Sequence, residues 1–377
     1  MKILFIAQRY HTNLYYRIKA LQDLGCHKIY FISLYKGGSE CYDCLEPIII
    51  GYSSIYLLFN KIISKFKKNY TKSFWELKLA IPNVKRLKQN IKEINPDVII
   101  LKDFQSLNEL ISLYYANKFN KKVITLTQTS KNHIRGSKIL LKLYLRFIKY
   151  LGVKYFITPT KRTKKALNSI GIENISYIPF VCGTQEFNKK YFLNNQINII
   201  SIGKFVPRKD QATLLKAVNL LKNQHKIKLT LIGEKVDLVY VNKIQKYIHG
   251  NNLESIVEIN FNKRYKKVLE LYKKNDLFIL PSYNEPAAVS IVEAMANKLP
   301  IICSDDCGTK CYIKEGKNGY IFKNKNYKDL AYKIKKVIDH KDVLINMGEK
   351  SFNMAKNNHS MQRFYLEFNK ILYDKIQ

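Results

Sequence analysis

The 377-residue sequence predicts an α/β protein made of two doubly wound domains that face each other across a cleft. Three observations lead to this fold class. The chain is too long for one typical domain. Apolar runs of strand length alternate with helical patterns, which predicts parallel sheets with right-handed crossovers. The strand candidates are near-continuous runs of Ile, Leu, Val and Phe, as expected where helices cover both faces of a sheet.

The individual elements follow from these patterns. In the first half we expect strands at 2–7, 28–34, 97–102, 122–127, 154–158 and 175–178, with helices at 12–24, 74–94, 105–119 and 137–151. In the second half we expect strands at 197–203, 227–232, 255–259, 277–281, 299–303 and 319–322, with helices near 210–223, 237–249, 264–274, 287–297 and 327–340. Because the alternation occurs twice, it predicts two domains.

The domain boundaries are expected where the pattern breaks. Residues 181–195 interrupt it just before a new strand, so we place the first domain at 1–182 and the second at 183–355. The last stretch, about 343–376, is helical and long enough to run back. We expect residues 356–377 to form a C-terminal helix that packs on the first domain.

The net charge of +36 can reflect solvated lysine faces, or it can indicate a polyanionic partner. Nucleic acid is one alternative, but lysine greatly outnumbers arginine, which bidentate phosphate and base recognition favours. The lysines are also spread along the whole chain. An anionic membrane surface is the other candidate, because 55–68 and 137–151 combine bulky apolar residues with cations. In the second segment the cations are Lys138, Lys142, Arg146 and Lys149.

The cysteine count and the hydropathy suggest a location. Seven cysteines in a chain of this size favour free thiols in a reducing compartment. The opening run 1–7 meets Gln8 and Arg9 at once, so it resembles a buried strand rather than a signal peptide. No stretch reaches the roughly 18 apolar residues that a transmembrane helix needs. We expect a cytoplasmic protein, with any contact at the inner face of the membrane being peripheral.

The segment 284–296 carries the clearest chemical pattern. Pro286 suits the first position of a helix, which leaves Glu285 in the loop ahead of it. The helix start then presents free backbone N–H groups, an anion site. These groups belong to Ala287, Ala288 and Val289. Glu293 follows about two turns later and is placed to reach the same ligand.

These residues resemble a known family. Glu285 and Glu293 reproduce the E-x7-E pattern of the retaining glycosyltransferases of family 4, the group 1 glycosyltransferases, which have the GT-B fold of two Rossmann-like domains. The flanking Leu280-Pro281-Ser282 and the run 203–210 (GKFVPRKD) are similar too, and the likeness continues through 315–319 (EGKNG). It covers most of 197–340, and the sequence is similar to bacterial surface-polysaccharide glycosyltransferases.

The resemblance implies a role for each residue. Lys204 and Lys209, beside Gly203, would bind the donor diphosphate. Glu285 would lie by the donor sugar and Glu293 by the ribose. Two cations and a helix start would stabilise the charge of a departing nucleoside diphosphate. The chain has no D-x-D sequence, so we expect no metal and no other cofactor.

The first domain matches the family less well. The run 8–13 (QRYHTN) stands where members often carry a Gly-Gly loop, and Gln128 stands where they often carry a histidine. Gln128 can hydrogen-bond a sugar hydroxyl but cannot take up a proton. Gln128 and Arg9 are therefore candidates for the acceptor side.

The resemblance predicts a retaining, metal-independent glycosyltransferase of capsule or O-antigen biosynthesis. It would use a UDP- or GDP-sugar donor and a saccharide acceptor, lipid-linked or free. A GT-B sugar-nucleotide epimerase is an alternative, against which the paired lysines and E-x7-E argue. A basic nucleic-acid-binding protein is the rival from another class, and it gives no role to the two glutamates.

Overall fold

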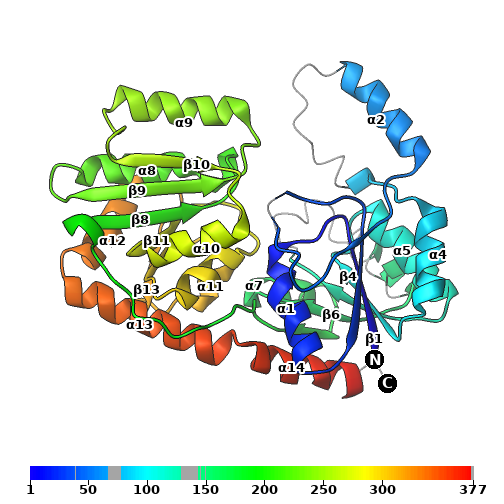
Figure 1. Ribbon diagram of the computed structural model, residues 1–377. Coiled ribbons are helices and arrows are strands. Elements are labelled where there is room, and N and C mark those ends of the chain that lie inside the picture. Colours follow the sequence, from blue (N-terminus) through cyan, green and yellow to red (C-terminus); the bar gives the residue numbers. More distant parts are fainter. Residues whose placement is uncertain (39, 67–77, 129–142, 145, 149, 375–377) are drawn as a thin grey trace. The chain divides into compact units, whose positions relative to one another are not determined.

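The computed structural model describes every residue except 39, 67–77, 129–142, 145, 149 and 375–377. The chain forms two compact units (Figure 1). The first contains Met1–Pro179 together with Met361–Gln377, and the second contains Phe180–Ser360. The sequence had suggested boundaries at 182/183 and 355/356. Each unit is an α/β domain with its own parallel sheet.

The first unit has a seven-stranded sheet with the order β3-β2-β1-β4-β5-β6-β7. Its strands are β1 (Lys2–Ala7), β2 (Lys28–Ser33), β3 (Ile48–Ile49), β4 (Val98–Lys102), β5 (Lys122–Leu126), β6 (Val153–Thr158) and β7 (Ile175–Tyr177). Its helices are α1 (Thr12–Asp23), α2 (Ser54–Phe66), α4 (Val84–Ile94), α5 (Leu107–Lys118), α7 (Lys161–Asn168) and α14 (Met361–Asp374). Central β1 pairs in parallel with both β2 and β4. The short β3 was not expected from the sequence.

The second unit has a six-stranded sheet with the order β10-β9-β8-β11-β12-β13. Its strands are β8 (Ile197–Ile202), β9 (Ile227–Gly233), β10 (Val257–Phe261), β11 (Leu277–Leu280), β12 (Ile301–Ser304) and β13 (Gly319–Phe322). Its α-helices are α8 (Gln211–Leu221), α9 (Leu238–Gly250), α10 (Tyr265–Lys273), α11 (Val289–Ala296), α12 (Tyr327–Ile338) and α13 (Lys341–Asn358). The order reverses between β8 and β11, which places the carboxyl ends of these two neighbours side by side.

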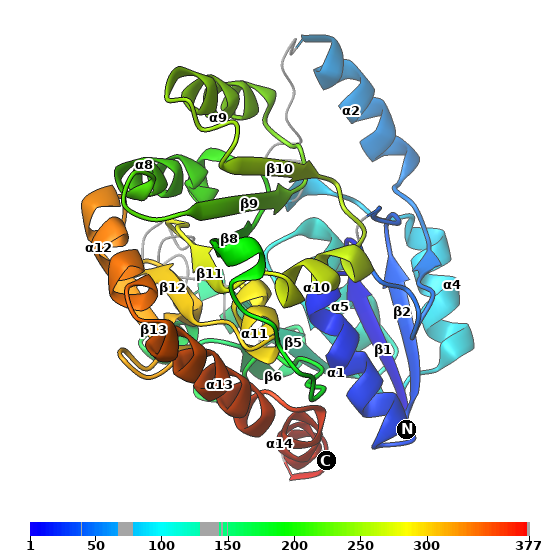
Figure 2. The same cartoon turned by 60° about the vertical axis from the view of Figure 1, so that its left-hand side comes forward.

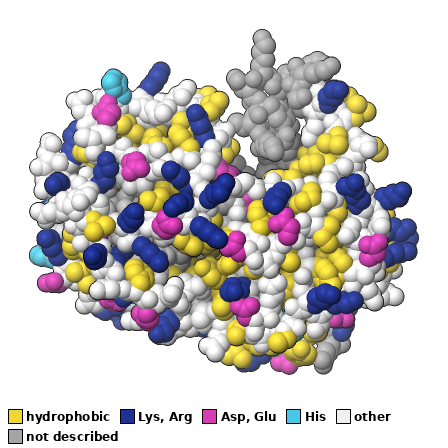
Figure 3. Space-filling view, in the orientation of Figure 1, with side chains coloured by type: hydrophobic (Ala, Val, Ile, Leu, Met, Phe, Trp, Pro, Cys, Tyr) yellow, Lys and Arg dark blue, Asp and Glu magenta, His cyan; other side chains and the backbone are white. Residues whose placement is uncertain are grey.

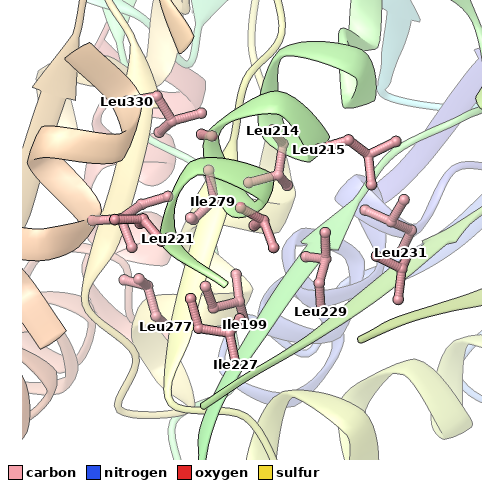
Figure 4. Packing of buried hydrophobic residues seen from close by; sticks show 14 of the residues in the cluster. Ile199, Leu214, Leu215, Leu221, Ile227, Leu229, Leu231, Leu277, Ile279 and Leu330 are labelled. Carbon is pink, nitrogen blue, oxygen red and sulfur yellow. The ribbon is translucent and has the colours of Figure 1, made fainter. Parts of the chain in front are cut away.

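Each unit has a separate apolar core. In the second unit, Leu214 and Leu215 of α8 pack with Ile199 of β8, Leu229 of β9 and Ile279 of β11 (Figure 4). All five side chains are fully buried. The strands contribute residues to both faces of the sheet, which explains their continuous apolar runs. The prediction of doubly wound α/β domains is confirmed.

Two predicted helices differ from the structure. The helix expected at 74–94 is interrupted at 80–83 and is helical again from Val84, because the backbone of 81–83 instead bonds to 51–53, with Asn83 N–H donating to the Gly51 carbonyl. Residues 74–77 of this prediction lie outside the described residues. The stretch 343–376, expected to be helical, contains two helices, α13 and α14, which are separated at His359 and Ser360. The C-terminal helix expected at 356–377 begins at Met361.

Helix α14 belongs to the first unit because it packs on α1 (Figure 2). Its buried face consists of Phe364, Phe368, Ile371 and Leu372. The guanidinium of Arg17, on α1, lies over the Phe364 ring at 5.7 Å from its centroid. The last helix of the chain thus completes the unit with which the chain begins.

Several apolar side chains of α2 are exposed, among them Ile55, Leu57, Leu58, Phe59 and Ile62. Lysines and arginines are scattered over the face drawn in Figure 3 rather than gathered in one patch. In the cationic segment 137–151, Lys138, Lys142 and Lys149 lie outside the described residues, and Arg146 is exposed. Within the described parts of the chain, no helix is long and apolar enough to cross a membrane.

Candidate functional site

The loop after β8 is shaped by close backbone packing. Gly203 follows the strand and its N–H bonds to the Ile232 carbonyl of β9. A Cβ at Gly233 would lie 2.0 Å from the Gly203 carbonyl oxygen, so the two loops meet where only glycine fits. A 3₁₀ turn, Pro207–Lys209, then leads to Asp210, which has φ +50° and caps α8 through Thr213. The turn presents Arg208 and Lys209 at the carboxyl end of the sheet.

The loop after β11 is fixed against two neighbouring loops. Tyr283 N–H donates to the Arg208 carbonyl at 2.9 Å, which ties this loop to the 3₁₀ turn. The Glu285 carbonyl accepts the Gly308 N–H at 2.8 Å. A Cβ at Gly308 would lie 1.8 Å from the Pro286 carbonyl oxygen. The backbone at Glu285 is therefore held from both sides.

The Glu285 carboxylate joins the two loops. Its Oε2 accepts hydrogen bonds from Arg208 Nη1 at 2.7 Å and from Lys209 Nζ at 2.5 Å. The Glu285 side chain is only 4% exposed, and Lys209 is 12% exposed. Burial would raise the pKa of Glu285, but the charges of Lys209 and Arg208 outweigh it and hold the pKa below its ordinary value. Glu285 is thus an ionised carboxylate held between two cations.

Of the two predicted lysines, only Lys209 meets Glu285. The Lys209 side chain lies across Gly203, whose Cβ would be 3.1 Å from Lys209 Cδ. Lys204 instead pairs with Glu234, with Nζ 2.7 Å from Oε2, and is 43% exposed. Arg208 takes the second place beside Glu285. Arg208 was not among the predicted site residues, although its position next to Lys209 in a turn ahead of a helix was the available signal.

Glu293 makes a different set of contacts. It lies on α11 and is 5% exposed. Its Oε1 accepts the Tyr265 hydroxyl at 2.9 Å and its Oε2 accepts the Tyr272 hydroxyl at 3.0 Å. Burial raises the pKa of Glu293, and the two phenols offset only part of this effect. Both carboxyl oxygens are engaged by tyrosines of α10, which sequence reasoning did not single out.

The start of α11 corrects one prediction. Pro286 is not the first helical residue: the helix begins at Val289, with Ala288 at the N-cap. The N–H of Ala288 is not free, because it donates to Thr309 Oγ1 at 3.3 Å. Ala287 lies in the loop with Pro286. The contacts of Gly308 and Thr309 hold the segment 285–288 out of helical geometry, so the uncapped helix start lies at Val289.

The two acceptor-side candidates lie in the first unit. Gln128 is half-buried just beyond the carboxyl end of β5. Arg9 follows β1 and pairs with Glu40, with Nη1 3.3 Å from Oε1. Both are at the carboxyl edge of their sheet, the edge at which ligands bind in open α/β domains.

Residues 182–358 match the model of the family described as glycosyl transferases group 1. These residues form a group 1 glycosyltransferase domain. The match spans nearly all of the second unit, including the two loops that hold Arg208, Lys209 and Glu285.

The relatives of this glycosyltransferase domain extend the comparison. The chain is 29% identical to the poly(ribitol-phosphate) alpha-N-acetylglucosaminyltransferase of Staphylococcus aureus strain COL, over 49% of this chain and 36% of the relative. It is 24% identical to the Staphylococcus aureus capsular polysaccharide biosynthesis glycosyltransferase CapM, over 55% and 54%. The matches thus cover less than two thirds of each relative.

Solved structures extend the likeness to the whole chain. The Anabaena protein HepE, solved in complex with UDP and glucose, superposes with a TM-score of 0.74 at 14% identity, covering 99% of this chain and 100% of HepE. A sequence identity this low supports a shared fold and nothing further. The glycosyltransferase domain and the first unit together have the GT-B fold, as predicted.

Proposed function

We propose that the protein is a retaining glycosyltransferase that transfers a sugar from a nucleoside diphosphate sugar to a saccharide acceptor. The observation that carries the proposal is the Arg208–Lys209–Glu285 cluster at the carboxyl edge of the second sheet. It lies inside the group 1 glycosyltransferase domain and near the uncapped start of α11. Two cationic side chains and the backbone N–H groups at a helix start can bind the negative charges of a diphosphate.

The chemistry follows from the charges. In the transfer, the bond between the anomeric carbon and the diphosphate oxygen breaks, and the acceptor hydroxyl oxygen bonds to the same carbon. The hydroxyl proton passes to the departing diphosphate. Lys209 and Arg208 would stabilise the charge that grows on this leaving group. Glu285 holds both cations in place and, at the sugar, can accept a hydroxyl hydrogen bond.

For the donor we favour a UDP-sugar over a GDP-sugar, because HepE was solved with UDP and glucose. Lys204, Gly203 and Glu293 are proposed to line the nucleotide side of this donor site. The Lys204–Glu234 pair and the Glu293–Tyr contacts would then rearrange or be bridged when the nucleotide binds. Metal-independent transfer is part of the proposal, since the side-chain cations supply positive charge at the diphosphate.

For the pathway we favour surface-polysaccharide assembly, because one relative is a capsular glycosyltransferase and another acts on poly(ribitol-phosphate). The acceptor is proposed to be lipid-linked, with the enzyme on the cytoplasmic face of the membrane. The exposed apolar side chains of α2, with Lys61 on the same helix, suit an anionic bilayer. Flotation with anionic vesicles checks this, and equal recovery with neutral vesicles would contradict it.

The central experiment titrates UDP and then assays transfer from UDP-, GDP- and dTDP-sugars. We expect the Lys209→Ala change to lower the transfer rate by about two to three orders of magnitude. Lys222→Ala is the matched control, because Lys222 Nζ bonds to the Asn251 carbonyl at the end of α9. EDTA should leave the rate unchanged, and NMR of the product should show the donor's anomeric configuration.

Three outcomes would reject the proposal. A well-folded protein that responds to no nucleotide in the panel but binds duplex nucleic acid would favour the nucleic-acid alternative. Conversion of the nucleotide sugar itself, without an acceptor, would favour an epimerase. An unchanged rate in Lys209→Ala would remove Lys209 from the reaction.

A further inference from the structure

The first unit contains a polar cavity that the proposed donor chemistry does not use. It has a volume of about 220 Å³ and opens at the carboxyl ends of β1 and β4. Gln8 lines it from β1, Lys102 from β4, and Ser106 and Glu109 from the start of α5. The carboxyl edge of a parallel sheet is where such domains bind ligands.

Lys102 lines this cavity from the carboxyl end of β4. Its Nζ forms no hydrogen bond or ion pair with any residue that the structure describes. Burial, assisted by the charge of Arg9, lowers the pKa of Lys102 to about 7, although Asp103, Glu109 and Glu40 oppose the shift. His11 and Lys78 also line the cavity. A buried ammonium group of this kind gains most from an anion that enters the cavity.

The start of α5 adds a second positive feature. Ser106 occupies the N-cap but does not cap the helix. Its hydroxyl donates to Glu109 Oε2 instead, and the Glu109 carboxyl accepts its own backbone N–H, so the N-cap side chain accepts no first-turn N–H group of this 12-residue helix. The positive end of the helix dipole therefore lies at the cavity wall.

Two acidic residues also line the cavity, and only one of them adds substantial negative charge at pH 7. Burial raises the pKa of Glu109 to about 8, so its carboxyl is mostly neutral at pH 7. Asp103 Oδ1 accepts the Phe104 N–H at 3.0 Å and the Thr127 hydroxyl at 3.3 Å, which fixes the carboxylate without removing its charge. Asp103 therefore offsets part of the positive charge of Lys102.

We propose that this cavity binds an anionic group, a phosphate or carboxylate, that the acceptor carries. Lys102 and the start of α5 would contact the anion. The assignment of the anion to an acceptor rests on the proposed function. The existence of the anion site does not.

The test titrates inorganic sulfate into the full chain by calorimetry at constant ionic strength, with saturating UDP. Sulfate keeps one charge state between pH 6.5 and 8. If the protonated Lys102 is the binding form, sulfate affinity should fall roughly eightfold over this range. Lys102→Met should weaken sulfate binding at pH 6.5 by about tenfold or more.

Two further variants keep the test falsifiable. Lys102→Arg should bind sulfate but lose most of the pH dependence, because arginine stays charged. Lys122→Met is the matched control, since Lys122 is exposed at the opposite end of the sheet, at the start of β5. Unchanged binding in Lys102→Met, or an eightfold pH effect retained in Lys102→Arg, would overturn the anion site. Melting by circular dichroism verifies that each variant folds.

The source of the anion is tested separately. A hexose 6-phosphate should bind more tightly than sulfate, whereas a neutral methyl hexoside should bind weakly. Equal affinity for sulfate and hexose phosphate would overturn the assignment to an acceptor, and tighter binding to anionic vesicles would assign the anion to a lipid headgroup. Repeating the sulfate titration in Lys209→Ala separates this site from the donor site, so either proposal can fail alone.

Discussion

Glu285 and Glu293 lie eight residues apart, yet their environments shift their pKa values in opposite directions. Glu285 meets two cations, Arg208 and Lys209, which hold it ionised despite burial. Glu293 meets two neutral phenols, which do not fully offset its burial. The same side chain type therefore loses its proton at a lower pH in one place and at a higher pH in the other.

The sign of the Glu285 shift predicts a pH dependence of stability. A lowered pKa in the folded state stabilises the fold above the ordinary value of 4.5, and this contribution is lost as the pH falls through the folded value. We expect Glu285→Gln to lower the free energy of unfolding by about 1–3 kcal/mol at pH 7, because Lys209 is left partly buried. Urea denaturation at pH 7 and pH 3.5 measures the difference, which should shrink at the lower pH.

Glu270→Gln is the control for this prediction. Glu270 is exposed and pairs with Lys267 on the surface of α10. Exposed pairs of this kind contribute about 0–1 kcal/mol, so its effect should be small. If Glu285→Gln lowers the free energy of unfolding equally at both pH values, that result would contradict the lowered pKa of Glu285.

At the scale of elements, the site depends on three loops that meet at the carboxyl edge of one sheet. β8 and β11 are neighbours, with Ile199 opposite Leu277, so the loops that follow them lie side by side. The loop after β12 contributes Gly308, whose backbone lies against that of Glu285 and Pro286. The segment 285–288 is extended because these contacts replace helical ones.

Gly308→Ala should disturb this arrangement. The added Cβ would lie 1.8 Å from the Pro286 carbonyl oxygen, so the backbone that carries Glu285 must move. We expect a loss of about 1–3 kcal/mol in stability and at least a tenfold loss of UDP affinity. Thermal unfolding and UDP titration measure the two effects.

Gly250→Ala is the matched substitution, because nothing lies within 4 Å of its added Cβ at the end of α9. It should leave UDP affinity unchanged and alter stability by less than about 1 kcal/mol. Normal UDP affinity in Gly308→Ala would show that the loop after β12 does not position the donor site.

At the scale of the whole molecule, the chain passes between the two units twice, at 179/180 and at 360/361. Each unit has its own core, and the first is completed only by the last helix of the chain. The break at His359 and Ser360 separates α13, which belongs to the second unit, from α14, which packs on α1. The first unit therefore depends on a segment that follows the second unit in the chain.

Phe368→Ala tests this dependence. Phe368 is 1% exposed on the face of α14 that packs against the first unit. We expect a loss of about 3–5 kcal/mol, and we expect amide exchange to rise in β1 and α1 rather than in β8 to β13. Leu366→Ala, at a position 61% exposed on the same helix, should have little effect. If amide exchange rises equally in both units, that result would contradict the assignment of α14 to the first unit.

Part of the site could be predicted because its signals are local in the chain. Lys209 follows a predicted strand in a turn ahead of a helix, and Glu285 precedes a helix after another strand. The topology then brings the two together. The helix start at Pro286 was wrong because the contacts of Gly308 and Thr309, more than twenty residues away, override the local preference for proline at a first helical position.

The sequence by itself determined the two parallel sheets, since the strand and helix periods repeat along each half of the chain and burial on both faces requires continuous apolar strands. Only the tertiary structure decided that Arg208 rather than Lys204 stands beside Glu285, and that Lys102 and the buried Glu109 line one cavity. The physical reason is that charge and protonation depend on burial and on neighbours from distant loops, which no local pattern specifies.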